Sequence, residues 1–155
     1  MRRFTVETAS EAETRGWGRR LGEILQAGDC VALTGDLGAG KTHFAMGVAE
    51  ALKIAEYITS PTFTIVNEYK SGIIPLFHFD AYRLGMPEEL WEIGFEEYRE
   101  AGGILLVEWA DLVKELLPSE TLWVQIQRQD AIDIDRRKIA FEIPEGDERF
   151  ADIGN

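Results

Sequence analysis

The stretch from Val31 to Met46, VALTGDLGAGKTHFAM, decides the fold. Its first residues form an apolar run typical of a buried strand, and its last residues favour a helix. Between them, Gly35 to Thr42 fits the pattern G-x-x-x-x-G-K-[ST], whose glycines let backbone N–H groups approach a phosphate closely. Lys41 is placed to contact the β- and γ-phosphates, the Thr42 hydroxyl to bind Mg²⁺, and the following helix directs its positive end at the anion. The sequence therefore predicts a P-loop that binds a nucleoside triphosphate.

The composition is that of an ordinary globular protein. The chain has 155 residues, of which 45% are hydrophobic and 28% charged, which predicts a single domain over residues 1–144 followed by a loose C-terminal tail over 145–155. Its single cysteine, Cys30, cannot form an internal disulfide and is expected to be a small core residue. No apolar run approaches the ~20 residues of a membrane span, and the N-terminus lacks the apolar stretch of a signal peptide. We expect a cytosolic protein.

The net charge of −12 argues against independent binding to a nucleic-acid backbone. A role in RNA metabolism is therefore expected to pass through a protein partner. Six glutamates gather in one segment, and they indicate either a solvated helix face or a docking face for a basic partner. These are Glu88, Glu89, Glu92, Glu96, Glu97 and Glu100.

Apolar periodicity and turn residues predict the order of the secondary-structure elements. A short strand around Phe4 and Val6 is followed by a helix over 11–26, with a capping box formed by Ser10 and Glu13. The remaining expected elements are a helix over 41–53, a hairpin with strands at 64–69 and 73–80, helical segments at 87–90 and 94–101, a buried strand at 104–107, a helix at 112–117, and an antiparallel pair at the sheet edge over 121–127 and 138–143.

Two carboxylates end apolar strands, where ligands bind in open α/β sheets. Asp80 follows Leu76 to Phe79, and Glu108 follows a run that begins at Ile104. Such residues often cap a helix or face water, but beside a P-loop they are candidates to hold Mg²⁺ and orient the attacking water. We therefore predict Asp80, Glu108 and Lys41 as catalytic residues.

Several other residues near these motifs are expected to contribute to the site or to its surroundings. The segment with Ser60, Pro61 and Thr62 predicts either a switch that senses the γ-phosphate or an ordinary turn. We expect His78 to be a core or hydrogen-bonded histidine, and His43 to reach the α-phosphate side. Three further residues are expected beside the site, with Tyr82 and Trp109 as packing or stacking residues and Arg83 as a charge partner of Asp80.

Four ordered motifs together resemble the TsaE (YjeE) family of small bacterial ATPases required for threonylcarbamoyladenosine modification of tRNA. They are Gly35-Asp36-Leu37-Gly38-Ala39-Gly40-Lys41-Thr42, Ser60-Pro61-Thr62-Phe63-Thr64, His78-Phe79-Asp80-Ala81-Tyr82-Arg83-Leu84 and Val107-Glu108-Trp109. The resemblance implies an α/β fold of the P-loop NTPase type, a three-layer sandwich whose mixed sheet has a parallel centre and antiparallel edge strands. His43 departs from the family, which often has a hydroxyl residue there.

The resemblance also implies the ligands and partners. ATP would bind the P-loop, Mg²⁺ would bind Thr42 and Glu108 with Asp80 beside them, and Asp80 would contribute to catalysis. Adenine contacts would come from Glu11, Thr14 and Arg136 or Arg137. The implied partners are the TsaD and TsaB proteins, with tRNA contacted only through that complex, which ATP hydrolysis would reset. A small-molecule kinase and a nucleotide-gated binding module remain alternative interpretations.

Overall fold

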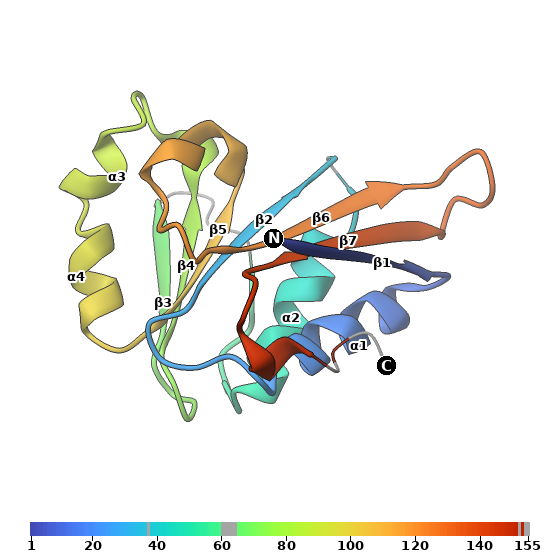
Figure 1. Cartoon of the computed structure of the whole chain (residues 1–155), viewed down its shortest axis with the longest axis horizontal. Coiled ribbons are helices and arrows are strands. Elements are labelled where there is room, and N and C mark those ends of the chain that lie inside the picture. The colour runs from blue at the N-terminus through green and yellow to red at the C-terminus, as the bar shows by residue number, and fades with distance from the viewer. Residues whose placement is uncertain (37, 60–64, 152, 154–155) are drawn as a thin grey trace.

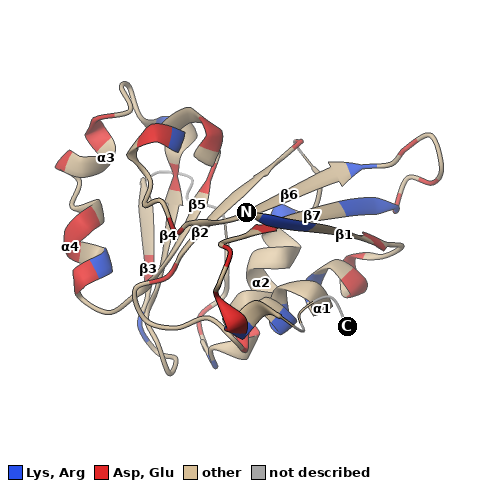
Figure 2. Ribbon diagram, in the orientation of Figure 1, with Lys and Arg blue, Asp and Glu red and all other residues tan. Residues whose placement is uncertain are grey.

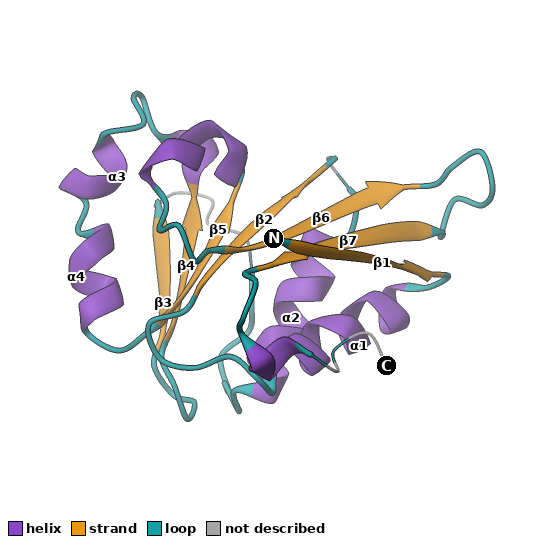
Figure 3. Ribbon diagram, in the orientation of Figure 1, coloured by secondary structure: helices purple, strands orange, loops and turns teal. Residues whose placement is uncertain are grey.

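The computed structural model describes residues 1–36, 38–59, 65–151 and 153 (Figure 1). Figure 3 distinguishes the helices, in purple, from the strands, in orange. The strands are β1 (Arg2–Thr8), β2 (Cys30–Gly35), β3 (Val66–Tyr69), β4 (Leu76–Asp80), β5 (Ile104–Glu108), β6 (Leu122–Arg128) and β7 (Arg137–Ile143). The α-helices are α1 (Glu11–Gly22), α2 (Lys41–Ala51), α3 (Glu89–Glu92) and α4 (Phe95–Glu100), and 3-10 turns occur at η1 (Ala81–Arg83), η2 (Ala110–Leu116) and η3 (Glu148–Phe150).

The strands form one mixed sheet in the order β1-β7-β6-β2-β5-β4-β3. The central strands β6, β2, β5 and β4 are parallel, whereas β3, β7 and β1 each pair antiparallel with their neighbour. The predicted parallel centre, antiparallel edges and hairpin are confirmed. The expectation that the β6–β7 pair forms the sheet edge is wrong, because β1 pairs with the outer side of β7 along its whole length.

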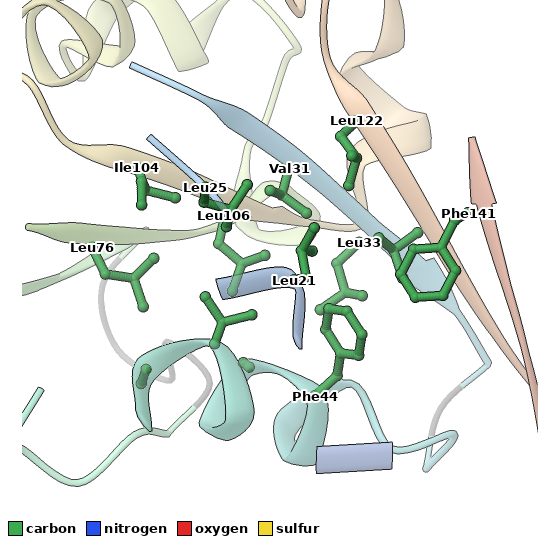
Figure 4. Close-up of a cluster of buried hydrophobic side chains, with 14 of the residues drawn as sticks. Leu21, Leu25, Val31, Leu33, Phe44, Leu76, Ile104, Leu106, Leu122 and Phe141 are labelled. Carbon is green, nitrogen blue, oxygen red and sulfur yellow. The ribbon is translucent and has the colours of Figure 1, made fainter. Parts of the chain in front are cut away.

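Two hydrophobic cores cover the two faces of the sheet. Central strand β2 contributes to both, because alternate side chains point to opposite faces: Val31 and Leu33 join the core under α1 and α2, and Cys30 and Ala32 join the core under α3, α4 and η2. Figure 4 shows the first core, in which Phe44 of α2 points toward the sheet. The sandwich therefore has three layers, and Cys30 is the small buried residue that was predicted.

Helices α1 and α2 are in backbone contact. A Cβ atom added at Gly47 of α2 would lie 1.9 Å from the carbonyl oxygen of Arg15, and one added at Gly18 of α1 would lie 2.1 Å from that of Phe44. Only glycine allows this approach. The contact brings the beginning of α1 beside the beginning of α2, where the P-loop ends.

Helix boundaries differ from expectation by a few residues. The predicted cap of α1 is confirmed, because Ser10 Oγ accepts a hydrogen bond from the Glu13 amide at 3.2 Å. Helix α1 ends at Gly22 rather than near residue 26, and α2 ends at Ala51 rather than near 53. The segment expected as a helix at 112–117 is the 3-10 turn η2.

The C-terminal segment packs against the first core instead of forming a loose tail. Phe150 is 2% exposed and Ile153 5% exposed, and both belong to that core. Arg149 fastens the segment through an ion pair with Asp29 at 2.8 Å, and Arg2 Nη2 donates to the Phe150 carbonyl at 2.7 Å. Among the described helices, none has the length and apolar character required to span a membrane.

Acidic residues recur along α3 and α4, where the ribbon of Figure 2 is repeatedly red. Glu88, Glu92, Glu97 and Glu100 are exposed to solvent. Glu96 is half-buried and lies 3.6 Å from Arg99 on the next turn of α4. This exposure fits the solvated helix face, while docking of a basic partner stays a prediction.

Candidate nucleotide-binding site

The P-loop joins the end of β2 to the start of α2 through backbone angles that favour glycine. Gly35 has a φ of 146° and Gly40 a φ of 104°, and Gly40 directly precedes the first helical residue. A Cβ atom at Gly35 would also lie 2.1 Å from the carbonyl oxygen of Ile126 on β6. Larger residues would therefore strain the loop and separate β2 from β6 at this point.

Lys41 is largely buried at the mouth of the loop, at 7% exposure. Its Nζ donates a hydrogen bond to the Gly35 carbonyl at 3.0 Å and lies 4.4 Å from the centre of the Trp109 ring. Trp109 adopts a left-handed backbone conformation with a φ of 56° directly after β5. The Tyr82 ring packs against it in a tilted arrangement, with ring centres 5.1 Å apart. Trp109 is thus the aromatic neighbour of the site that was predicted, and it stabilises the lysine charge.

Asp80 and Glu108 lie side by side at the ends of parallel strands. They occupy paired positions of β4 and β5. On β4, Leu76 faces the core under α2 whereas Phe77 and Phe79 face the other core, so strand alternation directs Asp80 to the α2 side. The same alternation directs Glu108 toward α2. The two carboxylates therefore face the P-loop helix together.

The surroundings of Asp80 affect its protonation. Burial raises the pKa of Asp80 above that of an exposed aspartate, the hydrogen bond from the Tyr82 amide lowers it, and the negative charge of Glu108 raises it. Arg83 Nε lies 3.4 Å from Asp80 Oδ2, which confirms the predicted charge pair.

Glu108 is in contact with a buried histidine on the neighbouring strand. His78 is fully buried, and its Nε2 lies 2.5 Å from Glu108 Oε2. The prediction of a hydrogen-bonded core histidine is confirmed. Its partner was not predicted.

A cavity of about 510 Å³ brings most of the predicted site residues together. It lies between the P-loop, the beginning of α1, the ends of β4 and β5, and the β6–β7 hairpin. The predicted residues that line it are Glu11, Thr14, Gly38, Ala39, Gly40, Lys41, Thr42, His43, Asp80, Glu108 and Arg137. Gly35 and Asp36 line a neighbouring cavity, and the predictions for Leu37 and for Ser60, Pro61 and Thr62 fall outside the described residues.

Sequence reasoning missed two residues that line the cavity, Ser10 and Asp135. The sequence indicates Ser10 only as the cap of α1, and Asp135 lies between the two expected strands at 121–127 and 138–143, where no motif marks it. The available signal for Ser10 is that it directly precedes Glu11, because a residue that caps a helix lies beside the first helical residue. Asp135 had only its position two residues before Arg137.

The residues expected near the nucleoside are held by contacts within the protein. Thr14 is 1% exposed, and its Oγ1 lies 2.8 Å from Thr8 Oγ1, a distance at which one hydroxyl donates to the other. His43 Nε2 lies 3.4 Å from Glu11 Oε2, so the ring faces the beginning of α1. These residues contribute walls to the cavity, and their direct contact with adenine stays a prediction.

Arg137, the first residue of β7, forms hydrogen bonds to the P-loop and lines the same cavity. Its Nε donates to the Ala39 carbonyl at 2.9 Å and its Nη2 to the Gly38 carbonyl at 3.4 Å. Arg136, the alternative considered for the adenine contact, lies 3.8 Å from Glu7 on β1. The structure thus gives Arg137 a role in loop geometry that the sequence did not indicate.

The donor set fits Mg²⁺ bound together with a nucleotide. Thr42, Asp80 and Glu108 line the same cavity and offer a hydroxyl and two carboxylates. Within the described ranges there is no group of three or more His, Cys, Asp or Glu side chains that could hold a metal ion. Mg²⁺ commonly binds through one or two carboxylates plus substrate phosphates and water, so this small set is sufficient.

Comparisons with known proteins agree with this architecture. Residues 8–139 match the family described as "Threonylcarbamoyl adenosine biosynthesis protein TsaE". The chain is 42% identical over 141 residues to the tRNA threonylcarbamoyladenosine biosynthesis protein TsaE of Bacillus subtilis, covering 91% of this chain and 86% of that protein. The same-named protein of Treponema pallidum is 40% identical over 76% of this chain and 87% of its own. The crystal structure of Bacillus subtilis YdiB superimposes with a TM-score of 0.79 at 35% identity, over 99% of this chain and 95% of that one.

Proposed function

The chain belongs to the TsaE family of threonylcarbamoyl adenosine biosynthesis proteins, and we propose that it acts there as a Mg²⁺-dependent ATPase. One observation carries the proposal. The P-loop residues Lys41 and Thr42 begin α2 opposite two adjacent strand-end carboxylates, Asp80 and Glu108, in one cavity. A P-loop alone binds a triphosphate, whereas hydrolysis also needs groups that hold the cation and orient water.

Each of these residues has a distinct task in the proposed site. Lys41 binds the β- and γ-phosphates once its ammonium leaves the Gly35 carbonyl. Thr42, Glu108 and Asp80 would hold Mg²⁺, which would supply positive charge to offset the negative charge of the phosphates. The two carboxylates are also placed to orient the attacking water, because both lie at the end of the sheet that faces the loop.

We propose that ATP hydrolysis changes the state of a protein complex and that this protein does not bind tRNA directly. The family resemblance implies TsaD and TsaB as partners, and ATP turnover would reset their complex between rounds of modification. The net charge of −12 supports contact with tRNA through these proteins, since a nucleic-acid backbone would repel this surface.

Two variants test the ATPase assignment. Lys41→Ala is expected to lose ATP binding, because the loop loses its phosphate-binding charge. Glu108→Ala is expected to bind ATP but not hydrolyse it. Equilibrium dialysis with ATP and release of inorganic phosphate measure the two properties separately, and equal ATP affinity in wild type and Lys41→Ala would refute the site.

Addition of TsaD and TsaB distinguishes the remaining possibilities. We expect phosphate release to rise when both proteins are present. Transfer of phosphate to a metabolite without such stimulation would identify a kinase. If Glu108→Ala supported repeated rounds of tRNA modification as well as wild type, ATP binding alone would be the useful step.

A further inference from the structure

His78 is a buried polar residue in an otherwise apolar part of β4. It lies between Phe77 and Phe79, and all three side chains are almost completely buried. Because Phe77 and Phe79 belong to the core under α3 and α4, strand alternation turns His78 to the opposite face, on which α2 begins. The imidazole thus lies on the catalytic face of the sheet without reaching solvent.

The register of the sheet brings this imidazole to Glu108. His78 pairs with Leu106 on β5, so Glu108 is its diagonal neighbour on the same face, two residues further along. The distance from Nε2 to Glu108 Oε2 is 2.5 Å, so the imidazole and the carboxylate are in direct hydrogen-bond contact. Glu108 is itself only 5% exposed.

We propose that His78 is a positioning residue, which donates from Nε2 to Glu108 and fixes the plane of the carboxylate toward the cation. The inference rests on the proposed function, in which Glu108 binds Mg²⁺. A hydrogen on Nε2 is present both in the imidazolium and in one neutral tautomer. The role therefore does not depend on the charge of the ring.

The other ring nitrogen of His78 indicates that placing this histidine in the core lowers the stability of the fold. Nδ1 of His78 is buried and has no hydrogen-bond partner among the described residues. A buried polar atom without a partner costs free energy, and a leucine at this position would avoid that cost. The interaction that offsets it is the bond to Glu108. Partners of this kind behind metal-binding side chains orient the ligand and tune the site.

The test measures metal affinity in the ADP complex rather than turnover. Mn²⁺ takes the same oxygen ligands as Mg²⁺ and is detected by electron paramagnetic resonance. We expect His78→Leu to weaken Mn²⁺ binding to the protein–ADP complex by roughly 10- to 100-fold. Its ADP affinity in EDTA should stay unchanged, because the P-loop is intact. His78→Gln, whose amide nitrogen reaches a position close to that of Nε2, should restore most of the Mn²⁺ affinity.

Two controls separate positioning from damage to the strand and from failure of the proposed function. Phe77→Leu perturbs the same strand on the opposite face and should leave Mn²⁺ affinity unchanged. Glu108→Gln should weaken Mn²⁺ binding if Glu108 is a ligand. Wild-type metal affinity in Glu108→Gln would overturn the proposed function, whereas loss in Glu108→Gln with none in His78→Leu would overturn only the role of His78.

A measurement on the wild-type protein keeps the inference testable if His78→Leu does not fold. Correlation of imidazole nitrogen and hydrogen signals by NMR identifies which ring nitrogen of His78 carries hydrogen. We expect hydrogen on Nε2, with a signal that shifts in Glu108→Gln. A ring with hydrogen only on Nδ1 would overturn the proposal, because Nε2 could then not donate.

Discussion

Replacement of Arg137 by alanine separates two roles for this residue, contact with adenine and support of the P-loop. In the structure its guanidinium donates to the carbonyls of Ala39 at 2.9 Å and Gly38 at 3.4 Å. A hydrogen bond from a charged group contributes about 1.5–3 kcal/mol. Because the second bond is long and the side chain is half-exposed, about 2 kcal/mol is a reasonable total for the pair.

That free energy sets the expected loss of affinity. In Arg137→Ala the ligand must order the loop that the arginine otherwise holds. A loss of about 2 kcal/mol of binding free energy corresponds to a dissociation constant that is roughly 30-fold larger. Calorimetric titration with Mg²⁺-ATP and with Mg²⁺-tripolyphosphate is the assay, since tripolyphosphate uses the loop but lacks a nucleoside. Support of the loop predicts a loss for both ligands.

The controls use the neighbouring arginine and a conservative change. Arg136→Ala removes a guanidinium that lies near Glu7 and should leave both affinities unchanged. Arg137→Lys keeps the charge but cannot form two bonds in the same plane, so an intermediate loss is expected. If Arg137→Ala weakened ATP binding and left tripolyphosphate binding at the wild-type value, the residue would act through adenine and the reasoning from the loop carbonyls would be wrong.

Two further predictions concern stability. Gly47→Ala should lower the free energy of unfolding by about 1–3 kcal/mol, because its Cβ would collide with the Arg15 carbonyl. Gly16→Ala on α1, where no heavy atom lies within 4 Å of the added Cβ, should raise it by up to about 1 kcal/mol. Equal effects of the two variants in urea denaturation would contradict the close helix contact. Arg149 lowers the pKa of Asp147 through a hydrogen bond, so the destabilisation of Arg149→Ala should be largest at pH 7 and shrink as the pH falls below the usual aspartate pKa of about 4. A difference that stays constant from neutral to acidic pH would show that this pair does not titrate as inferred.

The P-loop was predictable because its chemistry depends on contiguous residues. Glycines and Lys41 must lie at fixed spacing between a strand and a helix, and all of that information is local. Asp80 and Glu108 were also found from local patterns, as polar residues that end apolar strands. Their placement as neighbours depends on β4 lying next to β5, which no local pattern specifies.

Long-range pairing explains what the sequence did not reveal. Strand β1 joins β7 from the opposite end of the chain, with Phe4 opposite Phe141, so the edge of the sheet was assigned to the wrong strand. Phe150 and Ile153 were the available signal for a packed tail, because two large apolar residues stand there among charged ones. Neither residue indicates by itself which surface it covers.

The topology divides the site into two halves with different supports. Arg137 and the beginning of α1 approach the P-loop from the β1–β7 side, where the contacts reach the loop carbonyls and the start of α2. Asp80 and Glu108 approach from β4 and β5, where His78 and Arg83 hold the carboxylates. Strand β2 lies between the two halves, since it pairs with β6 on one side and β5 on the other, and α2 begins where they meet. Changes on the first side are therefore expected to act on the P-loop, which we propose binds phosphate, and changes on the second on the carboxylates. The two effects should be separable in measurements of nucleotide and metal affinity.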